Sequence, residues 1–269
     1  MKGFEVLGRS VRISGVLLMG LLGCHPAPTP PVFLWHSVGE GRPNDRYDLT
    51  AAEFDAQLTL LERHGATPVT FDDLWDARAG LRPLPAHAVV LTFDDGRACL
   101  FSQALPLLLK HRMKAEAFVV SSFLGEDEAH RHANQDDGGR HPFLLWSELA
   151  QMVESGAIIA ESHSATHPRL PNLGTLAQRK EMEDSAHELR ARLRAPIHFF
   201  AYPFGSSNEW TRLILATTDY RGGISVGRRW SDRWALPRTS IQRGATDLFE
   251  RTLTDAFGPV RAAPATGRK

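Results

Sequence analysis

The 269-residue sequence contains little cysteine, has no excess of either charge, and has no long apolar stretch after its first residues. Only Cys24 and Cys99 are present, too few for the disulfide framework that stabilises many small secreted domains. Lys and Arg together number 31, as do Asp and Glu. A chain without net charge offers no overall field that attracts nucleic acid. We therefore expect no nucleic-acid partner and a stability that depends on an apolar core.

The first residues have the pattern of an export signal. Three basic residues precede an apolar run from Ile13 to Gly23, which is too short for a permanent membrane span and typical of a signal peptide. The run ends in the letters LLGC at Cys24, similar to the lipobox of bacterial lipoproteins. That resemblance implies cleavage before Cys24 and acylation of the new N-terminus, hence an exported protein held on a membrane by a lipid anchor. An ordinary signal peptide with an incidental cysteine is the alternative.

The rest of the chain alternates between strand-like and helix-like segments. After a signal peptide (1–23) and a proline-rich tether (24–31), we expect one domain over 32–258 and a flexible tail over 259–269. Repeated strand-then-helix units predict a parallel sheet covered by helices, and a barrel fits the length. Strands are predicted at 32–35, 69–71, 88–93, 117–120, 157–161, 197–202, 223–226 and 235–241.

Two adjacent carboxylates end the predicted strand 88–93. Asp94 and Asp95 are followed by Gly96, which permits a sharp turn. Barrel enzymes place their chemistry at this end of the strands. Adjacent residues of a strand point to opposite sides, so one carboxylate is expected to bind a metal and the other to handle a proton. Asp72 and Asp73 repeat the pattern without the glycine, so we expect them to cap a helix.

A pair of histidines follows the predicted strand 157–161. His163 and His167 are four residues apart, a spacing that places two ligands on one side of a tight loop. Two polar loop histidines without a metal are the alternative. With Asp95 as third ligand, the set suits Zn²⁺ or a similar divalent ion, and leaves positions open for water and substrate.

These two motifs, followed by Tyr202-Pro203-Phe204-Gly205 after a further strand, resemble the polysaccharide deacetylase family (carbohydrate esterase family 4, the NodB-homology domain). The resemblance implies a distorted (β/α)7-type barrel and hydrolysis of N-acetyl groups on a polysaccharide. It implies that Asp95, His163 and His167 bind the metal, with Zn²⁺ favoured and Co²⁺ or Ni²⁺ as alternatives. It also implies that Asp94 is the catalytic base and that the Phe204 N–H stabilises the oxyanion.

The sequence departs from the family pattern at two positions. Ala201 replaces the usual arginine that orients the catalytic aspartate, and no histidine follows His198, where the usual general acid lies. Both departures are similar to the branch that deacetylates poly-β-1,6-N-acetylglucosamine of biofilms. We predict that Arg238 replaces the missing arginine and that His36, which directly follows the strand 32–35, is the general acid. A surface arginine and a histidine bonded within the barrel wall are the alternatives.

Other functions remain open at this point. The same metal site suits a deacetylase of peptidoglycan or chitooligosaccharides, because only the loops around the groove distinguish these amides. A catalytically inactive lipoprotein that binds glycan is the alternative from another class. The presence of Asp94, Asp95, His163 and His167 together favours an enzyme.

Cys24→Ser tests the predicted anchor. The substitution removes the thiol that carries the acyl chain, so the enzyme should move to the soluble fraction or remain an uncleaved precursor. Fractionation and the mass of the mature protein measure this. Cys99→Ser is the matched control, and unchanged behaviour of the Cys24 variant would indicate an ordinary signal peptide.

Overall fold

A computed structural model describes residues 29–39, 41–42, 44–133, 141–226 and 231–260. The predicted signal peptide and Cys24 lie outside the described residues, as do most of the predicted tether and of the predicted tail. No helix among the described residues is long and apolar enough to cross a membrane.

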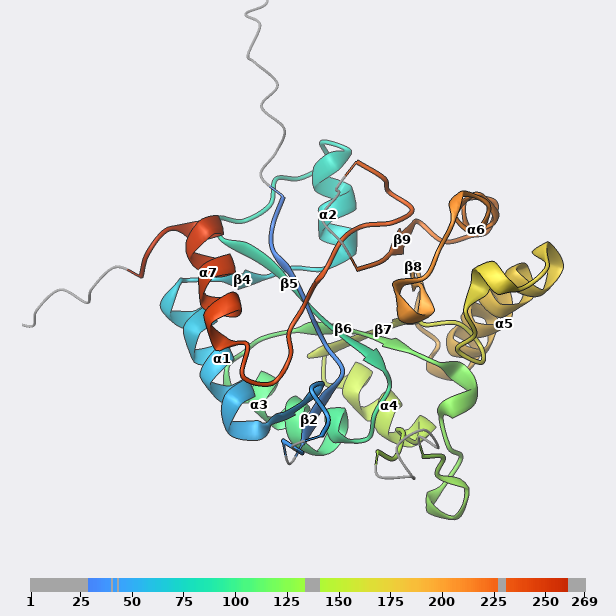
Figure 1. The fold of residues 1–269 in the computed structure, drawn as a ribbon, viewed down its shortest axis with the longest axis horizontal. Helices are drawn as coiled ribbons and strands as arrows, with labels where there is room; N and C mark the ends of the chain where they lie inside the picture. Colours follow the sequence, from blue (N-terminus) through green and yellow to red (C-terminus); the bar gives the residue numbers. More distant parts are fainter. Residues whose placement is uncertain (1–28, 40, 43, 134–140, 227–230, 261–269) are drawn as a thin grey trace, which may run out of the picture.

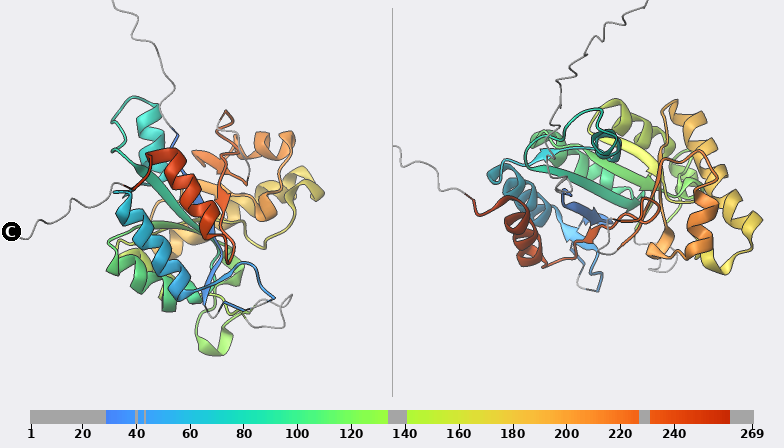
Figure 2. Two further views of the ribbon diagram at one scale, coloured as in Figure 1. Left: turned by 60° about the vertical axis from the view of Figure 1, so that its left-hand side comes forward. Right: turned by 90° about the horizontal axis from the view of Figure 1, so that it is seen from above.

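Parallel strands form a curved sheet with helices on its outer side (Figures 1 and 2). Seven strands run in the order β10-β1-β5-β6-β7-β8-β9, and β4 pairs with the start of β5. A bridge between Ile224 and Leu236 joins β9 to the segment before β10, so the ends of the sheet approach each other. This is the predicted distorted barrel. The strands are β1 Val32–Trp35, β4 Thr67–Pro68, β5 Ala88–Asp95, β6 Ala115–Val119, β7 Ile158–Ser162, β8 Phe199–Ala201, β9 Gly222–Ile224 and β10 Thr239–Ser240.

Most of the helices lie against the outer side of this sheet, whereas the helix that begins at Phe71 packs its Phe71 and Leu74 into the cluster inside the barrel. Helices α1 and α7 pack side by side at one edge, and α5 and α6 pack together at the other (Figure 1). A short parallel pair, β2 Ser37–Gly39 and β3 Asp48–Thr50, adds a second small sheet that the sequence pattern did not predict. The helices are α1 Ala51–Arg63, α2 Phe71–Arg78, α3 Leu105–Lys110, α4 Trp146–Glu154, α5 Thr175–Leu193, α6 Glu209–Leu215 and α7 Thr246–Phe257.

Strand β5 separates two apolar layers. Its residues Val89, Leu91 and Phe93 face the layer between sheet and helices, whereas Ala88 and Val90 face a smaller cluster inside the barrel. The alternation of a strand then places Thr92 and Asp94 on the inner side as well. The barrel interior is thus apolar at its base and becomes polar toward the end of β5.

The second Asp-Asp pair lies at the start of helix α2. Thr70 is the N-cap, and Asp73 accepts from the Thr70 backbone N–H at 2.8 Å in a capping box. The predicted cap is therefore confirmed for Asp73, whereas Asp72 pairs with His198 and Arg221. The predicted strand 69–71 is wrong, because this capping box begins a helix at Phe71 and the strand pairing occurs earlier, at β4.

Two glutamates are buried inside the barrel. Glu116 accepts from the Phe71 N–H at 3.0 Å, and Glu161 accepts from the His198 and Phe199 N–H groups at 2.8 Å. Burial raises the pKa of Glu116 to about 8, although the bond from Phe71 acts in the opposite direction. The pKa of Glu161 is raised by burial and by the charge of Glu116. Both carboxyl groups therefore favour the protonated form more than an exposed glutamate does. Their role in the fold is to accept hydrogen bonds from backbone N–H groups.

Glu116→Gln should reduce the dependence of folding stability on pH. Between the ordinary pKa of 4.5 and about 8, the unfolded chain has lost this proton and the folded chain retains it. The free energy of unfolding therefore falls as pH rises, by at most about 1.4 kcal/mol per pH unit. The glutamine side chain still accepts the hydrogen bond from the Phe71 N–H. Because the pKa of Glu161 is also raised, part of the pH dependence of the free energy of unfolding remains in the variant. Urea unfolding at pH 5 and 8 measures it, with exposed Glu154→Gln as control; equal slopes in wild type and variant would contradict the prediction.

Candidate active site

A cavity of about 610 Å³ lies at the end of the barrel where strands β1, β5, β7 and β8 end. His36 directly follows β1, Asp94 and Asp95 end β5, His163 follows β7, and Phe204 lies three residues after β8. All of these residues line the cavity. A larger cavity at the opposite end is mainly apolar and contains none of them. The predicted site residues therefore converge on one place, apart from Arg238, which reaches Asp94 from within the wall.

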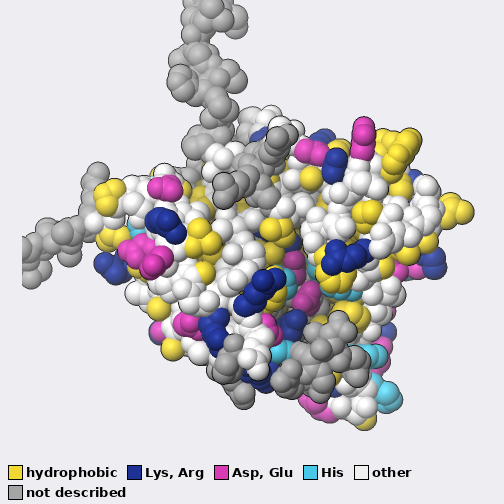
Figure 3. Space-filling model, viewed as in Figure 1, with side chains coloured by type: hydrophobic (Ala, Val, Ile, Leu, Met, Phe, Trp, Pro, Cys, Tyr) yellow, Lys and Arg dark blue, Asp and Glu magenta, His cyan; other side chains and the backbone are white. Residues whose placement is uncertain are grey.

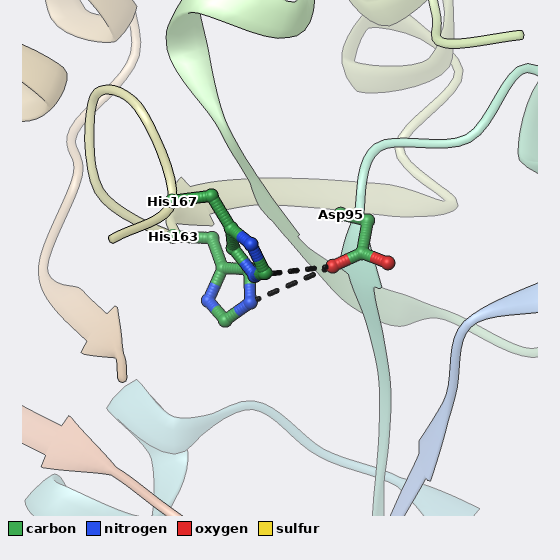
Figure 4. A group of neighbouring side chains, drawn as sticks. All are labelled: Asp95, His163 and His167. Atoms are coloured by element: carbon green, nitrogen blue, oxygen red, sulfur yellow. Dashed lines mark ion pairs between the residues drawn. The ribbon is translucent and has the colours of Figure 1, made fainter. Parts of the chain in front are cut away.

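Asp95, His163 and His167 form a compact group of possible metal ligands (Figure 4). Asp95 Oδ1 lies 3.7 Å from His163 Nε2 and 3.6 Å from His167 Nε2, and one ligand atom from each residue lies within 4.8 Å of the others. Two donors bound to one zinc ion at about 2.1 Å stand about 3.4 Å apart in a tetrahedral site. The spacing of these oxygens and nitrogens therefore fits a shared divalent ion.

The two histidines are held in the form that binds metal. The His163 Nδ1–H donates to the Ala201 carbonyl at 2.9 Å, which fixes the ring with Nε2 directed at Asp95. Burial and the neighbouring His163 lower the pKa of His167 to about 4, so this imidazole is neutral near pH 7. Both features favour metal binding, because an imidazole binds metal only when the ligating nitrogen is deprotonated.

Contacts on both sides hold the loop between these histidines. Ser164 Oγ accepts from the His167 N–H at 2.9 Å, and Glu181 of α5 accepts from the Thr166 N–H and hydroxyl at 2.8 and 2.7 Å. The Ser164 carbonyl accepts from the Ser121 N–H at the end of β6. The histidine spacing predicted the loop, but nothing in the sequence marked Glu181 as its anchor.

Asp94 forms a buried ion pair with Arg238. The guanidinium donates to Asp94 Oδ1 at 2.7 Å and Oδ2 at 2.6 Å, and it also bonds Thr92 Oγ1 and the Ser225 carbonyl. Burial alone would raise the pKa of Asp94, but the charges of Arg238 and His163 lower it below its ordinary value. Asp94 is therefore ionised and held in one orientation, with Oδ2 3.8 Å from His163 Nε2.

The route by which Arg238 reaches Asp94 differs from the sequence argument. The argument placed Arg238 at the rim, within a strand 235–241. In the structure β10 begins only at Thr239, which pairs with Phe33 of β1, and Phe33 pairs with Leu91, three residues before Asp94. Arg238 thus starts deeper in the barrel, and its side chain extends along the inner wall to the carboxylate.

The two adjacent carboxylates do not point to opposite sides. Asp95 has φ 73° and Gly96 has φ 80°, so the chain leaves the extended conformation and turns the Asp95 side chain toward the cavity that Asp94 also lines. Gly96 is required, because a Cβ there would approach Val119 Cγ1 to 3.1 Å. Burial would raise the pKa of Asp95, but the charges of His36 and Arg97 lower it well below its ordinary value.

His36 lies in the same cavity beside Tyr47, with ring centres 4.6 Å apart. Its Nδ1 is buried and has no hydrogen-bond partner among the described residues. Burial lowers the pKa of His36, and the charges of Asp95 and Asp94 act in the opposite direction. The described residues thus supply no hydrogen bond within the barrel wall for Nδ1, although the His36 residue itself lines the cavity.

The third motif presents Phe204 in an unusual conformation. Phe204 has φ 60°, and its ring lies 4.5 Å from the His167 ring between that histidine and the Arg169 guanidinium. Its backbone N–H takes part in no hydrogen bond found among the described residues. An N–H without a partner among the described residues is available to an oxyanion.

Arg97 is a site residue that the sequence reasoning missed. It is largely buried, and its Nε and NH2 lie 3.4 Å from Asp95 Oδ2, so Oδ1 remains directed at the two histidines. The only sequence signal was its position directly after Asp94-Asp95-Gly96. The Ala201 carbonyl was missed as well, because a backbone acceptor leaves no mark in side-chain identity.

Comparisons with known proteins point to one family of enzymes. A family model described as polysaccharide deacetylase matches residues 82–223. The chain is 26% identical over 218 residues to the YxkH protein of Bacillus subtilis (strain 168), covering 80% of this chain and 72% of that one. It is 23% identical over 222 residues to the poly-β-1,6-N-acetyl-D-glucosamine N-deacetylase of Staphylococcus aureus (strain MSSA476), covering 77% and 71%. The structure of the Streptococcus pyogenes deacetylase PplD matches with a TM-score of 0.72 at 22% identity, covering 86% and 98%.

His163→Ala should lower the content of bound divalent metal strongly, because two of three protein ligands cannot replace the full set. Elemental analysis and a competition titration with a chelator measure this. His187→Ala, on the exposed face of α5, is the matched control. Equal metal content in the two variants would contradict the ligand assignment.

Proposed function

The chain belongs to the polysaccharide deacetylase family, and from that premise we propose that it is a metal-dependent N-deacetylase acting on poly-β-1,6-N-acetylglucosamine. The family comprises hydrolases that remove acetyl groups from glycans. The observation that carries the proposal is the convergence of Asp95, His163 and His167 with a base, Asp94, that Arg238 holds in place. The S. aureus relative and the departures at Ala201 and after His198 support the choice of polymer.

The proposed metal ligands are Asp95, His163 and His167. Two imidazoles and one carboxylate suit Zn²⁺, with Co²⁺ or Ni²⁺ as alternatives. A divalent ion bound there supplies a Lewis acid that polarises a carbonyl oxygen and lowers the pKa of water. Arg97, through its contact with Asp95 Oδ2, keeps the carboxylate turned so that Oδ1 faces the histidines.

The remaining residues have roles that follow from their positions. Asp94 accepts a proton from the water that adds to the acetamide carbon, and Arg238 keeps Asp94 ionised and fixed in direction. The N–H of Phe204, which has no partner among the described residues, donates to the developing oxyanion. When the carbon–nitrogen bond breaks, acetate leaves and the amine needs a proton, which His36 donates. Its lowered pKa makes that donation most effective on the acid side of neutrality.

Two alternatives keep the same site. Peptidoglycan or chitooligosaccharides differ from the proposed polymer in linkage and substituents, and a cavity of about 610 Å³ holds only the reacting part of any of them. A protein that only binds glycan does not need a buried carboxylate that two hydrogen bonds from Arg238 keep ionised and oriented, so this ion pair favours an enzyme. A panel of acetylated glycans separates these cases.

Asp94→Asn should lower the rate of amine and acetate release by about 10²-fold or more while metal binding is kept, since an amide cannot accept the proton. Asp72→Asn is the matched control. It changes the corresponding residue of the duplicated motif, which pairs with His198 and Arg221 away from the cavity, and should leave the rate intact.

The assay uses poly-β-1,6-N-acetylglucosamine, acetylated peptidoglycan and chitooligosaccharides with metal-loaded protein. Release from β-1,6-linked substrate above the others supports the proposed polymer. Release from another substrate alone would replace it, and no release from any would overturn the enzymatic function. If the Asp94 and Asp72 variants lose activity equally, the assignment of Asp94 as base is wrong.

His36→Ala should keep the metal and lower kcat for acetamide substrates more than for an activated acetate ester, whose leaving group needs little protonation. Steady-state rates on both substrates, together with metal content, measure the difference. Equal losses would point to a positioning role for His36, and unchanged rates on both would reject any role in the reaction.

A further inference from the structure

Two similar stacks of side chains flank the mouth of the cavity. In one, the Arg46 guanidinium lies 4.8 Å from the centre of the Tyr47 ring, and that ring lies 4.6 Å from the His36 ring. In the other, the Arg169 guanidinium lies 4.2 Å from the Phe204 ring, which lies 4.5 Å from the His167 ring. Each stack leads from an exposed arginine, through an aromatic ring, to a histidine of the proposed site.

The two mouth arginines carry positive charge that no carboxylate among the described residues neutralises. Arg238 pairs with Asp94 from within the barrel wall, and Arg97 pairs with Asp95 in the cavity. Within the part of the chain that the structure describes, neither Arg46 nor Arg169 has a carboxylate within ion-pair distance; Arg46 donates to the Tyr47 hydroxyl at 2.9 Å instead. Stacking on a ring face holds a guanidinium in place without removing its charge.

The cavity as a whole is therefore positive. Three arginines and two aspartates line it, an excess of one positive charge to which a divalent ion adds two. Figure 3 shows Lys and Arg side chains around the hollow in which acidic and histidine side chains are exposed. N-deacetylation turns a neutral acetamide into an amine that is cationic near neutral pH. Each turnover on a polymer thus creates a charge of the same sign as the mouth.

We propose that Arg46 and Arg169 make the enzyme select fully acetylated stretches of its substrate and reject stretches that already carry glucosaminium residues. The inference rests on the proposed function. Two like charges about 10 Å apart in water repel by about 0.4 kcal/mol, which weakens binding about two-fold. The repulsion is larger near a protein surface, where the effective dielectric constant is lower. Two arginines together therefore give a discrimination of about 5-fold at low salt. The rate of deacetylation therefore falls as glucosaminium residues accumulate on a polymer. The final product keeps acetylated residues between the deacetylated ones.

The test compares two oligosaccharides on the metal-loaded enzyme. One is a fully acetylated pentamer, and the other is the same pentamer with glucosamine beside the acetylated residues, in the linkage that the enzyme hydrolyses. The ratio of kcat/KM for acetate release is measured at about 25 mM and 300 mM NaCl, since screening acts over about 8–10 Å at physiological salt. Because both substrates use the same enzyme, changes in metal loading or stability cancel in the ratio.

Wild type should prefer the acetylated pentamer by about 5-fold at low salt, and this preference should shrink in high salt and at a pH that neutralises the amine. The Arg46→Gln, Arg169→Gln double variant should lower the ratio to within about two-fold, and Arg169→Glu should lower it further or reverse it. Arg63→Gln on the exposed surface of α1 is the matched control and should keep the wild-type ratio.

A wild-type ratio near one, a ratio that does not change with salt, or a double variant with the wild-type ratio would overturn the role of the mouth arginines while leaving the deacetylase function intact. Absence of acetate release from either pentamer in either linkage would overturn the proposed function, and this inference with it. Equilibrium binding of the two pentamers to the same variants separates selection at binding from selection in the chemical step.

Discussion

The ion pair between Asp94 and Arg238 is the interaction on which both the site and the barrel depend. Both side chains are almost completely buried, and a charge in that position without its partner costs about 3–5 kcal/mol. The same guanidinium bonds Thr92 of β5 and the carbonyl of Ser225 just after β9. The pair therefore joins opposite parts of the sheet, fixes the carboxylate in one orientation, and holds it ionised in a setting that would otherwise favour the neutral acid.

Around this pair, the backbone is held in conformations that L-residues seldom adopt. Asp95, Ser164, His167 and Phe204 all have φ between 60° and 73°, and each such residue costs of order 1 kcal/mol. All four lie at or beside the cavity, while the other described non-glycine residues with positive φ, His87, Arg112 and Arg194, lie elsewhere. Strand pairing, the Glu181 anchor and the ring contacts of Phe204 offset the strain. The result is a set of possible ligating and donating atoms that the fold itself directs toward the cavity.

Much of this arrangement could be predicted from sequence. Buried apolar segments located most strands, the Thr50–Glu53 capping box located helix α1, and Gly96 distinguished the Asp-Asp pair that lines the cavity from its copy. The strand at 69–71 was wrong because a local capping bond outweighs the strand propensity of Val69 and Thr70. The convergence of Asp95 with Asp94 could not be predicted, since it depends on one positive φ at a strand end. Arg97 was marked only by its position after Gly96, and nothing local marks Arg46 or Tyr47, which reach the site through tertiary contacts.

The order of strands in the sheet links folding to the proposed chemistry. Asp95 ends β5 and His163 follows β7, and these strands never touch, because β6 lies between them and pairs with both. The three donor atoms approach one another only after β6 has been inserted. The proposed ion would therefore bind tightly to the completed sheet and weakly to any chain in which β6 is misplaced. The ratio of bound metal to protein would then measure the fraction of molecules whose sheet is correctly assembled, and this measurement needs no substrate.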